Sequence, residues 1–580
     1  MSMDLSRRKF LSRSAKSALL VAAYGVIEAK GGSVFINSFA PAWTQSAAVQ
    51  PVFARLDEYI ARHMRETGAP GMTLALANRS GLIRASTYGY ADTKAGLKVE
   101  NETMFEIGSV SKSFVALALI QLKDEGKIDF NKPVTDYLPW LKINSKFEAI
   151  TTHHLLNHSA GLPGVPLLHD AIFDELWTAY EPGKRFLYSN TGYNILGFLI
   201  EAVDKRPFAD AMRQRLLVPL GMTASSSTIT NETRKRMAIG YEPLAEGKPF
   251  PLHGTLAEAQ WLEVDVAAGS IASTPGDMAK YVRMLLNRGA LPKGRLISEE
   301  GFKLFTKAAI DSPYRGEPAS YGYGLWVSDI EGHTRLRHTG GMVAFSSALD
   351  VDVTSGVGAF ASVNANLRGY RPVAVTKYAV ELFNASLDGK KLPDAPAAAP
   401  PADEVKNAVD YVGEYESPTG KKLVLTAEGD KLILAYGGRR IPLERAAATG
   451  DRFIVRHPDF ETYLLGFMRD NRVVTEAYHG ADWFAGARYA GPRTFEVRKD
   501  FATYEGHYFN DSPWYGDARV VYRKGRLYLD GLQPLVARGD GKFGIGDPEA
   551  PDWVSFETVI DGRAMRLNFS GIPFRRMFTP

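Results

Sequence analysis

A Pro/Ala-rich run near residue 400 is the feature that most constrains what this chain can fold into. The sequence PDAPAAAPP fills residues 393–401 and follows the polar stretch DGKK at 388–391. Such a run cannot continue a helix or a strand, and it is typical of a semi-stiff linker. We therefore predict a linker over 388–405. The chain of 580 residues is also too long for one ordinary core, so separate domains are expected on either side of the linker.

The region after the linker has the pattern of antiparallel β-structure, because short alternating runs are separated by Gly-rich turns. A Tyr-x-Gly-x-Tyr sequence occurs at 411–415 and again at 504–508, each time followed by strand, turn and strand. This repeat predicts two small barrels over 406–495 and 498–580, which would remove their own sheet edges by closing. A single larger β-sandwich is the alternative.

The N-terminus resembles a twin-arginine export signal. Arg7 and Arg8 are followed by apolar residues, then by a short apolar stretch over 18–27 and by small residues suited to cleavage. About ten apolar residues cannot span a bilayer, which needs roughly 20. We expect residues 1–48 to be the signal and the mature protein to lie in the periplasm or to be otherwise exported. A disordered basic tail is the alternative. No later segment is apolar enough to predict a membrane span.

The composition of the chain argues against cysteine chemistry, nucleic-acid binding and a metal site. The chain has no cysteine, which excludes disulfides, thiolate nucleophiles and iron–sulfur clusters. Its net charge is only +4, and no basic arm predicts nucleic-acid binding. His153 and His154 are adjacent, but neighbouring residues point apart and no His-Glu-x-x-His spacing accompanies them. We therefore expect neither a metal site nor a cofactor, and any covalent catalysis must use another nucleophile.

A serine and a lysine one helical turn apart provide a candidate nucleophile. Ser109 and Lys112 open an apolar run that reads as a helix to about Lys123, with Gly126 as a stop signal. The hydroxyl and the amine would then share one face of the helix. A desolvated lysine can lose its charge and assist removal of the serine proton, while the free N–H groups of the helix N-terminus face a developing oxyanion. The spacing alone is weak, because Ser6 and Lys9 also show it.

Two later motifs add to this pair. Tyr188-x-Asn190 supplies a phenol that can accept and donate a proton, and an amide that can bind a substrate carbonyl and orient the lysine. The sequence His338-Thr339-Gly340-Gly341 follows a strand-like segment. A strand there could offer the backbone N–H of Gly341 as an oxyanion donor.

The order Ser-x-x-Lys, Tyr-x-Asn, His-Thr-Gly resembles the class C β-lactamase and D-alanyl-D-alanine carboxypeptidase family of serine hydrolases. The flanking sequences HLLNHSAGLPG at 154–164 and YGYGLW at 321–326 support the resemblance, which extends from about Pro51 to Ala385. It implies an α+β catalytic domain over 49–387, with a helical lobe, an α/β lobe containing an antiparallel sheet, and a site in the cleft between them. The β-rich half resembles the two lipocalin-like barrels of D-aminopeptidases in this family.

By this resemblance Ser109 is the acylated nucleophile, and Lys112 and Tyr188 activate it and move protons; which of the two is the base stays open. Asn190, His338, Thr339 and Gly340 are expected to bind substrate, and the N–H groups of Ser109 and Gly341 to form the oxyanion hole.

β-Lactamases of this family typically carry lysine where this chain has His338. A neutral or titrating imidazole weakens the fixed charge that would hold a β-lactam carboxylate. We therefore expect a peptidase or amidase acting on small peptides, with D-residues possible, and an esterase as the main alternative. A true β-lactamase and a non-catalytic binding protein are less favoured. The oligomeric state stays open.

Overall fold

The computed structural model describes residues 20–29, 32–41, 49–164, 176–244, 255–367, 369–446, 450–496 and 498–578. The chain forms two compact units, and the main division between them falls between Ala398 and Ala399, within the segment predicted as a linker. None of the described helices combines the length and the apolarity needed to cross a bilayer.

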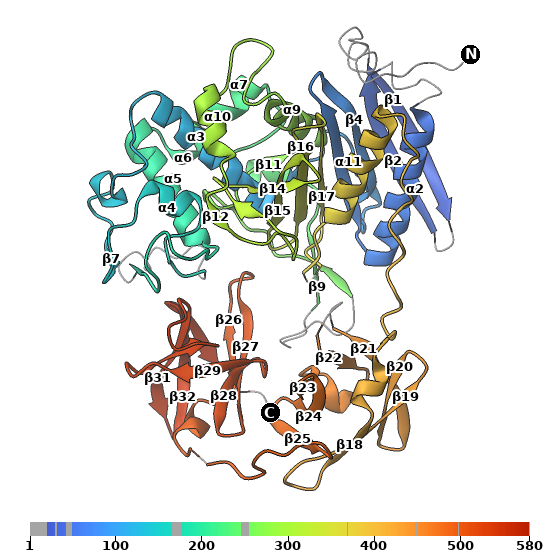
Figure 1. The fold of residues 1–580 in the computed structure, drawn as a ribbon, viewed down its shortest axis with the longest axis vertical. Coiled ribbons are helices and arrows are strands. Elements are labelled where there is room, and N and C mark those ends of the chain that lie inside the picture. The colour runs from blue at the N-terminus through green and yellow to red at the C-terminus, as the bar shows by residue number, and fades with distance from the viewer. Residues whose placement is uncertain are drawn as a thin grey trace. The chain divides into compact units, whose positions relative to one another are not determined.

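The first unit is built on an antiparallel sheet of eleven described strands, drawn in blue and olive in Figure 1. Their order is β1-β2-β4-β3-β17-β16-β15-β14-β13-β12, with β5 paired to β4. The strands are β1 (Leu20–Ala29), β2 (Gly32–Pro41), β3 (Gly71–Asn78), β4 (Gly81–Asp92), β5 (Leu97–Lys98), β12 (Ile310–Asp311), β13 (Ser320–Tyr321), β14 (Trp326–Ile330), β15 (His333–Gly341), β16 (Ser346–Asp352) and β17 (Val357–Val363).

Helices cover both faces of this sheet, because alternate residues of a strand point to opposite sides. Val357, Ala359, Ala361 and Val363 of β17 belong to a core shared with α2 (Gln50–Thr67) and α11 (Val373–Leu387). Gly358, on the other face, lies against Val282 of α9 (Pro275–Leu286). The central strands are therefore buried on both sides, and α2 and α11 lie next to each other (Figure 1).

A group of helices forms a lobe beside the sheet, as the resemblance implied. Its centre is α3 (Ser111–Asp124), whose residues from Ser111 to Ile120 are all buried, and which contacts α5, α6 and α10. The other described helices of this lobe and its surroundings are α4 (Thr152–Leu156), α5 (Asn190–Asp204), α6 (Phe208–Met212), α7 (Val218–Leu220), α8 (Asn231–Arg234) and α10 (Glu299–Phe305). Short strand pairs join the lobe: β6 (Phe105–Glu106) with β11 (Ala272–Ser273), β7 (Ile143–Asn144) with β8 (Leu176–Trp177), and β9 (Tyr241–Pro243) with β10 (Leu256–Glu258).

Part of the segment predicted as an export signal lies in the sheet. The hairpin of β1 and β2 pairs through Ile36–Phe39 with β4. Arg7 and Arg8, which carry the resemblance to a twin-arginine signal, lie outside the described residues. The export signal stays a prediction.

The second unit contains two closed antiparallel barrels, each of eight described strands, which confirms the predicted pair and excludes the single β-sandwich. The first barrel comprises β18 (Gly413–Glu416), β19 (Lys422–Glu428), β20 (Lys431–Tyr436), β21 (Arg439–Arg445), β22 (Arg452–Val455), β23 (Leu465–Asp470), β24 (Val473–His479) and β25 (Asp482–Gly486). The second comprises β26 (Gly506–Asn510), β27 (Gly516–Arg523), β28 (Arg526–Leu529), β29 (Gln533–Ala537), β30 (Lys542–Ile545), β31 (Trp553–Ile560), β32 (Arg563–Phe569) and β33 (Ile572–Arg576).

The repeated Tyr-x-Gly-x-Tyr sequence has the same structural role in both barrels. It joins a short 3₁₀ turn to the first strand, and the second tyrosine hydroxyl donates to the carbonyl of the first tyrosine. This bond runs from Tyr415 to Tyr411 over 2.9 Å and from Tyr508 to Tyr504 over 2.8 Å. Tyr415 and Tyr508 are buried. The motif therefore fixes the turn into the first strand of each barrel and gives its buried phenol a partner.

Candidate active site

Ser109 lies where the chain turns from β6 into α3. It sits in a 3₁₀ turn, Gly108–Val110, and α3 begins at Ser111, so Lys112 is in the first turn of the helix. Gly108 has φ +53°, and a Cβ atom there would lie 2.8 Å from the Gly341 nitrogen. Glycine is therefore required for this close approach of two backbones. This close approach places Ser109, which is partly accessible, beside the end of β15.

Lys112 is completely buried, and its amine has three polar neighbours. The Nζ atom lies 3.0 Å from Oγ of Ser109, 2.7 Å from Oδ1 of Asn190 and 2.8 Å from the carbonyl oxygen of Ala268. Two of these neighbours can only accept a hydrogen bond. A neutral amine would satisfy both with its two hydrogens and direct its lone pair at the hydroxyl of Ser109.

Burial lowers the pKa of Lys112 well below its usual range, because a charged ammonium loses its hydration there. No carboxylate among the described side chains forms an ion pair with it. Neither the amide oxygen of Asn190 nor the carbonyl of Ala268 carries a full charge that would hold the proton. The site is thus built to keep an uncharged amine beside a serine hydroxyl.

Tyr188 lies just before α5, whose N-terminus is capped by Ser189, its Oγ atom accepting from the Gly192 N–H. The Lys112 Nζ atom is 4.9 Å from the centre of the Tyr188 ring. Burial raises the pKa of Tyr188 above its usual value, and a hydrogen bond with the Ser109 side chain only partly opposes this. The phenol therefore remains protonated at neutral pH, next to the serine. Asn190, two residues on, begins α5.

The end of β15 carries the remaining predicted residues. Thr339, Gly340 and Gly341 pair with β16 in register, and a Cβ atom on Gly340 would collide with the Ile107 carbonyl oxygen. Only glycine allows β15 to lie this close to the segment that leads into Ser109.

His338 is buried, and both of its ring nitrogens have partners. Its Nδ1 lies 2.6 Å from the Thr339 carbonyl, to which it must donate, so Nε2 accepts from the Tyr321 hydroxyl at 3.0 Å. Burial and the neighbouring Lys112 lower the pKa of His338 to about 3. The imidazole is therefore neutral at ordinary pH, and its part in substrate binding stays a prediction.

The structure brings Ser109, Lys112, Tyr188, Asn190 and Gly341 into one place, although they are distant in sequence. It also adds three groups that sequence reasoning did not assign. Ala268 contributes only a main-chain carbonyl, which leaves no sequence signal. Arg371, next to Tyr370 and just before α11, has its guanidinium against Gly341 and 3.3 Å from Oγ of Ser346. His158 packs on Tyr188 and had been noted only within a flanking sequence.

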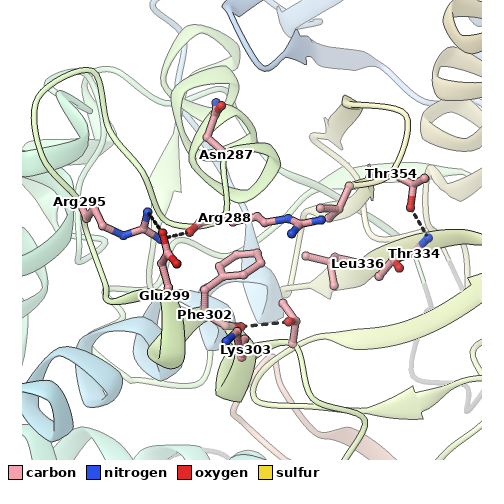
Figure 2. A pocket seen from close by; sticks show the side chains of 11 residues that line it. Asn287, Arg288, Arg295, Glu299, Phe302, Lys303, Thr334, Leu336 and Thr354 are labelled. Atoms are coloured by element: carbon pink, nitrogen blue, oxygen red, sulfur yellow. Dashed lines mark hydrogen bonds and ion pairs between the residues drawn. The ribbon is translucent and has the colours of Figure 1, made fainter.

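A separate cavity of about 410 Å³ opens elsewhere on the first unit (Figure 2). None of the motif residues lines it. Its walls come from the residues after α9, the segment into α10, α10 itself, β15 and the turn after β16. Its lining includes the charged side chains of Arg288 and Arg295 and the apolar side chains of Phe302 and Leu336 (Figure 2). Among the described residues, no cluster of His, Asp and Glu is arranged to hold a metal ion.

Comparison with known proteins identifies the family of the first unit. The family model described as Beta-lactamase matches residues 56–381. Protein flp of Staphylococcus aureus (strain N315) is 26% identical over 353 residues, covering 57% of this chain and 66% of that protein, slightly less than two thirds of its length. Penicillin-binding protein 4* of Bacillus subtilis (strain 168) is 25% identical over 419 residues, covering 66% of this chain and 87% of that protein.

A solved structure has a similar fold. It is that of the octameric penicillin-binding protein homologue from Pyrococcus abyssi, with a TM-score of 0.54, 24% sequence identity, and coverage of 74% of this chain and 99% of that one. At this level of identity the likeness concerns the fold alone. The family model, in contrast, spans more than half of the sequence and includes all three motifs. The chain belongs to the Beta-lactamase family of serine hydrolases, which also includes penicillin-binding proteins.

Proposed function

We propose that this protein is an exported serine peptidase or amidase that forms an acyl-enzyme on Ser109 and acts on small peptides. The observation that carries the proposal is the set of contacts around Lys112: a buried amine, 3.0 Å from a serine hydroxyl, with two uncharged acceptors occupying its hydrogens. An inert buried lysine would need a carboxylate partner instead.

Acylation then follows from this arrangement. The Lys112 amine takes the proton of the Ser109 hydroxyl while Oγ bonds to the substrate carbonyl carbon. The carbonyl oxygen becomes an oxyanion that accepts hydrogen bonds from the N–H groups of Ser109 and Gly341. When the intermediate collapses, the bond to the leaving nitrogen breaks and the Tyr188 phenol protonates that nitrogen. Lys112 then returns its proton to Tyr188, which leaves the acyl group bound to Ser109 as an ester. Water hydrolyses this acyl-enzyme by the same proton transfers in reverse order.

The pKa directions support this division of roles. A lysine whose pKa is lowered can accept a proton at neutral pH, whereas a tyrosine whose pKa is raised can donate one. We therefore assign Lys112 as the base for Ser109 and Tyr188 as the acid for the leaving group.

The substrate class rests on His338 and on the barrels. A neutral His338 supplies no fixed charge for a β-lactam carboxylate, which argues against a β-lactamase. The two closed barrels match the resemblance to D-aminopeptidases, which favours peptide substrates. An esterase remains the alternative, because the same groups cleave esters more easily than amides.

Matched chromogenic substrates test the substrate class. Hydrolysis of D- or L-aminoacyl p-nitroanilides by the wild type, absent in Ser109→Ala, is the expected result. Turnover of p-nitrophenyl esters without any anilide cleavage would favour the esterase. A folded protein that cleaves neither substrate and takes no penicillin or fluorophosphonate label would favour the binding protein. Penicillin is a suitable probe because one relative is named as a penicillin-binding protein.

Export is tested separately. We expect the full chain to appear in the periplasmic fraction of a bacterium with an active twin-arginine system. A variant in which both Arg7 and Arg8 are lysine should remain in the cytoplasm. Equal export of the two forms would contradict a twin-arginine signal.

A further inference from the structure

His158 is a buried histidine beside the active site to which the proposed reaction gives no part. It follows α4, with φ +59°, in the left-handed region that histidine, asparagine and aspartate enter more readily than most residues. Only 1% of its surface is exposed. A residue held in this uncommon conformation inside a core needs strong local constraints.

Those constraints come from both sides of Tyr188. The N–H of Leu187 donates to the His158 carbonyl over 2.8 Å, and the N–H of Ser189 donates to its Nδ1 atom over 3.1 Å. One histidine thus binds the N–H groups of the two residues on either side of Tyr188, one with its main-chain carbonyl and one with its ring. Because Nδ1 accepts, the neutral ring carries its hydrogen on Nε2.

The imidazole also packs directly on the phenol. The ring centres of His158 and Tyr188 are 4.2 Å apart, with an angle of 37° between the planes. Trp326 lies parallel to the Tyr188 ring at 6.2 Å. Phe186, Tyr193 and Tyr321 surround the other sides of the imidazole. Tyr188 is therefore fixed both along its backbone and across its ring.

The contact depends on an uncharged imidazole. A protonated ring would place a hydrogen on Nδ1 and lose the bond from the Ser189 N–H. Burial, together with the neighbouring Lys112 and His338, lowers the pKa of His158 well below its usual value. The ring therefore stays an acceptor without placing a charge near the amine that must remain neutral.

We propose that His158 is a positioning residue that holds the Tyr188 phenol at Ser109 through the Ser189 N–H and through ring contact. The inference rests on the proposed function, because it concerns the proton transfer that Tyr188 performs there. It predicts that substitutions of His158 act on the chemical step and act only while Tyr188 has its hydroxyl.

Two variants separate the two contacts. His158→Phe keeps a ring and removes the acceptor, whereas His158→Asn keeps an acceptor, tolerates the left-handed backbone and removes the ring. We expect kcat to fall about tenfold or more in His158→Phe and less in His158→Asn, with KM changing less than about threefold, because the loss falls on transition-state stabilisation. His154→Ala is the control, since the His154 ring accepts from the Thr151 N–H at the start of α4, the helix that precedes His158.

The deciding measurement is a double-mutant cycle with Tyr188→Phe, made on proteins that melt cooperatively and label at Ser109. His158→Phe and His158→Asn should cause little further loss of kcat in the Tyr188→Phe background. The same loss in both backgrounds, or an unchanged kcat in both single variants, would overturn the positioning role. If only one His158 variant folds, the cycle is read from that one. A wild type without hydrolytic activity would instead refute the proposed function.

Discussion

The Asn190 Oδ1 atom lies 2.7 Å from the Lys112 Nζ atom, joining the first residue of α5 to the first turn of α3. This contact gives the buried amine an acceptor without giving it a counter-charge. Burial can therefore keep the pKa of Lys112 low. The choice of an amide at position 190 decides whether the amine can act as a base.

Asn190→Asp should give the Lys112 amine the counter-charge that the amide does not supply. A carboxylate of nearly the same shape would stabilise the charged ammonium and raise the pKa of Lys112. We expect the acid limb of kcat/KM to move to higher pH by about 1–3 units, with lower activity at pH 7. Asn144→Asp, which makes the same change on an exposed strand residue, should leave the profile unchanged. An unmoved limb in Asn190→Asp would mean that Lys112 is not the titrating base.

Gly108→Ala tests the close approach of two backbones at the proposed oxyanion hole. Its Cβ would lie 2.8 Å from the Gly341 nitrogen and would push the two donor segments apart. Losing one such donor costs about 10²–10³ in kcat. Gly96→Ala is the matched control, because Gly96 has φ +68° with nothing within 4 Å. Both variants should lose about 1–2 kcal/mol of stability from left-handed strain, and Gly108→Ala should lose more because its methyl group also clashes with the backbone of Gly341. Equal kcat values in the two variants would contradict this role for Gly108.

The active-site pair was open to prediction because it is local. A Ser-x-x-Lys sequence at the start of a helix places both side chains on one face. The strand-like segment before Gly340 and Gly341 was likewise read from its local pattern, whereas its close approach to the segment before Ser109 is seen only in the structure. The contacts of Lys112 with Ala268 and of His158 with the N–H of Ser189 were not predictable, because each depends on a backbone group brought in from a distant loop. Neither Ala268 nor Ser189 stands in a motif that assigns its main-chain group a partner, so these contacts leave no mark in the sequence.

In the fold, too, features set by local sequence were predictable and features set by long-range pairing were not. The Tyr-x-Gly-x-Tyr repeat predicted two barrels because each copy begins an independent closed sheet. The pairing of β2 with β4 was not predicted. Residues 32–41 fall within the segment 1–48 that was expected to be an export signal, so no strand was expected there. Only the long-range register reveals the strand.

His338→Lys tests the electrostatic account of the site. A second buried cation would disfavour the protonated form of Lys112 and move the acid limb of kcat/KM to lower pH. His338→Gln adds no charge and should leave the limb in place, because the pKa of His338 is lowered to about 3 and the wild-type ring does not titrate in the assay range. A limb that disappears in His338→Gln would show that the imidazole is the titrating group after all.

Glu106 should make the stability of the protein pH-dependent. Burial raises the pKa of its carboxyl to about 8, whereas in the unfolded chain it titrates near 4.3. Between these values the folded state holds a proton that the unfolded state releases, so stability falls as pH rises, by up to about 1.4 kcal/mol per unit. Glu106→Gln resembles the protonated form and should flatten this dependence in urea unfolding from pH 5 to pH 8. Identical slopes for both proteins would contradict a buried, neutral Glu106.

Covalent trapping tests the central claim most directly. The folded wild type is treated with a fluorophosphonate, and the modified residue is located by peptide mass spectrometry, with Ser109→Ala as the control. The account predicts one adduct per chain, on Ser109, and none in the variant. An adduct on another residue, or none at all in folded wild-type protein, would contradict the assignment of Ser109 as the nucleophile.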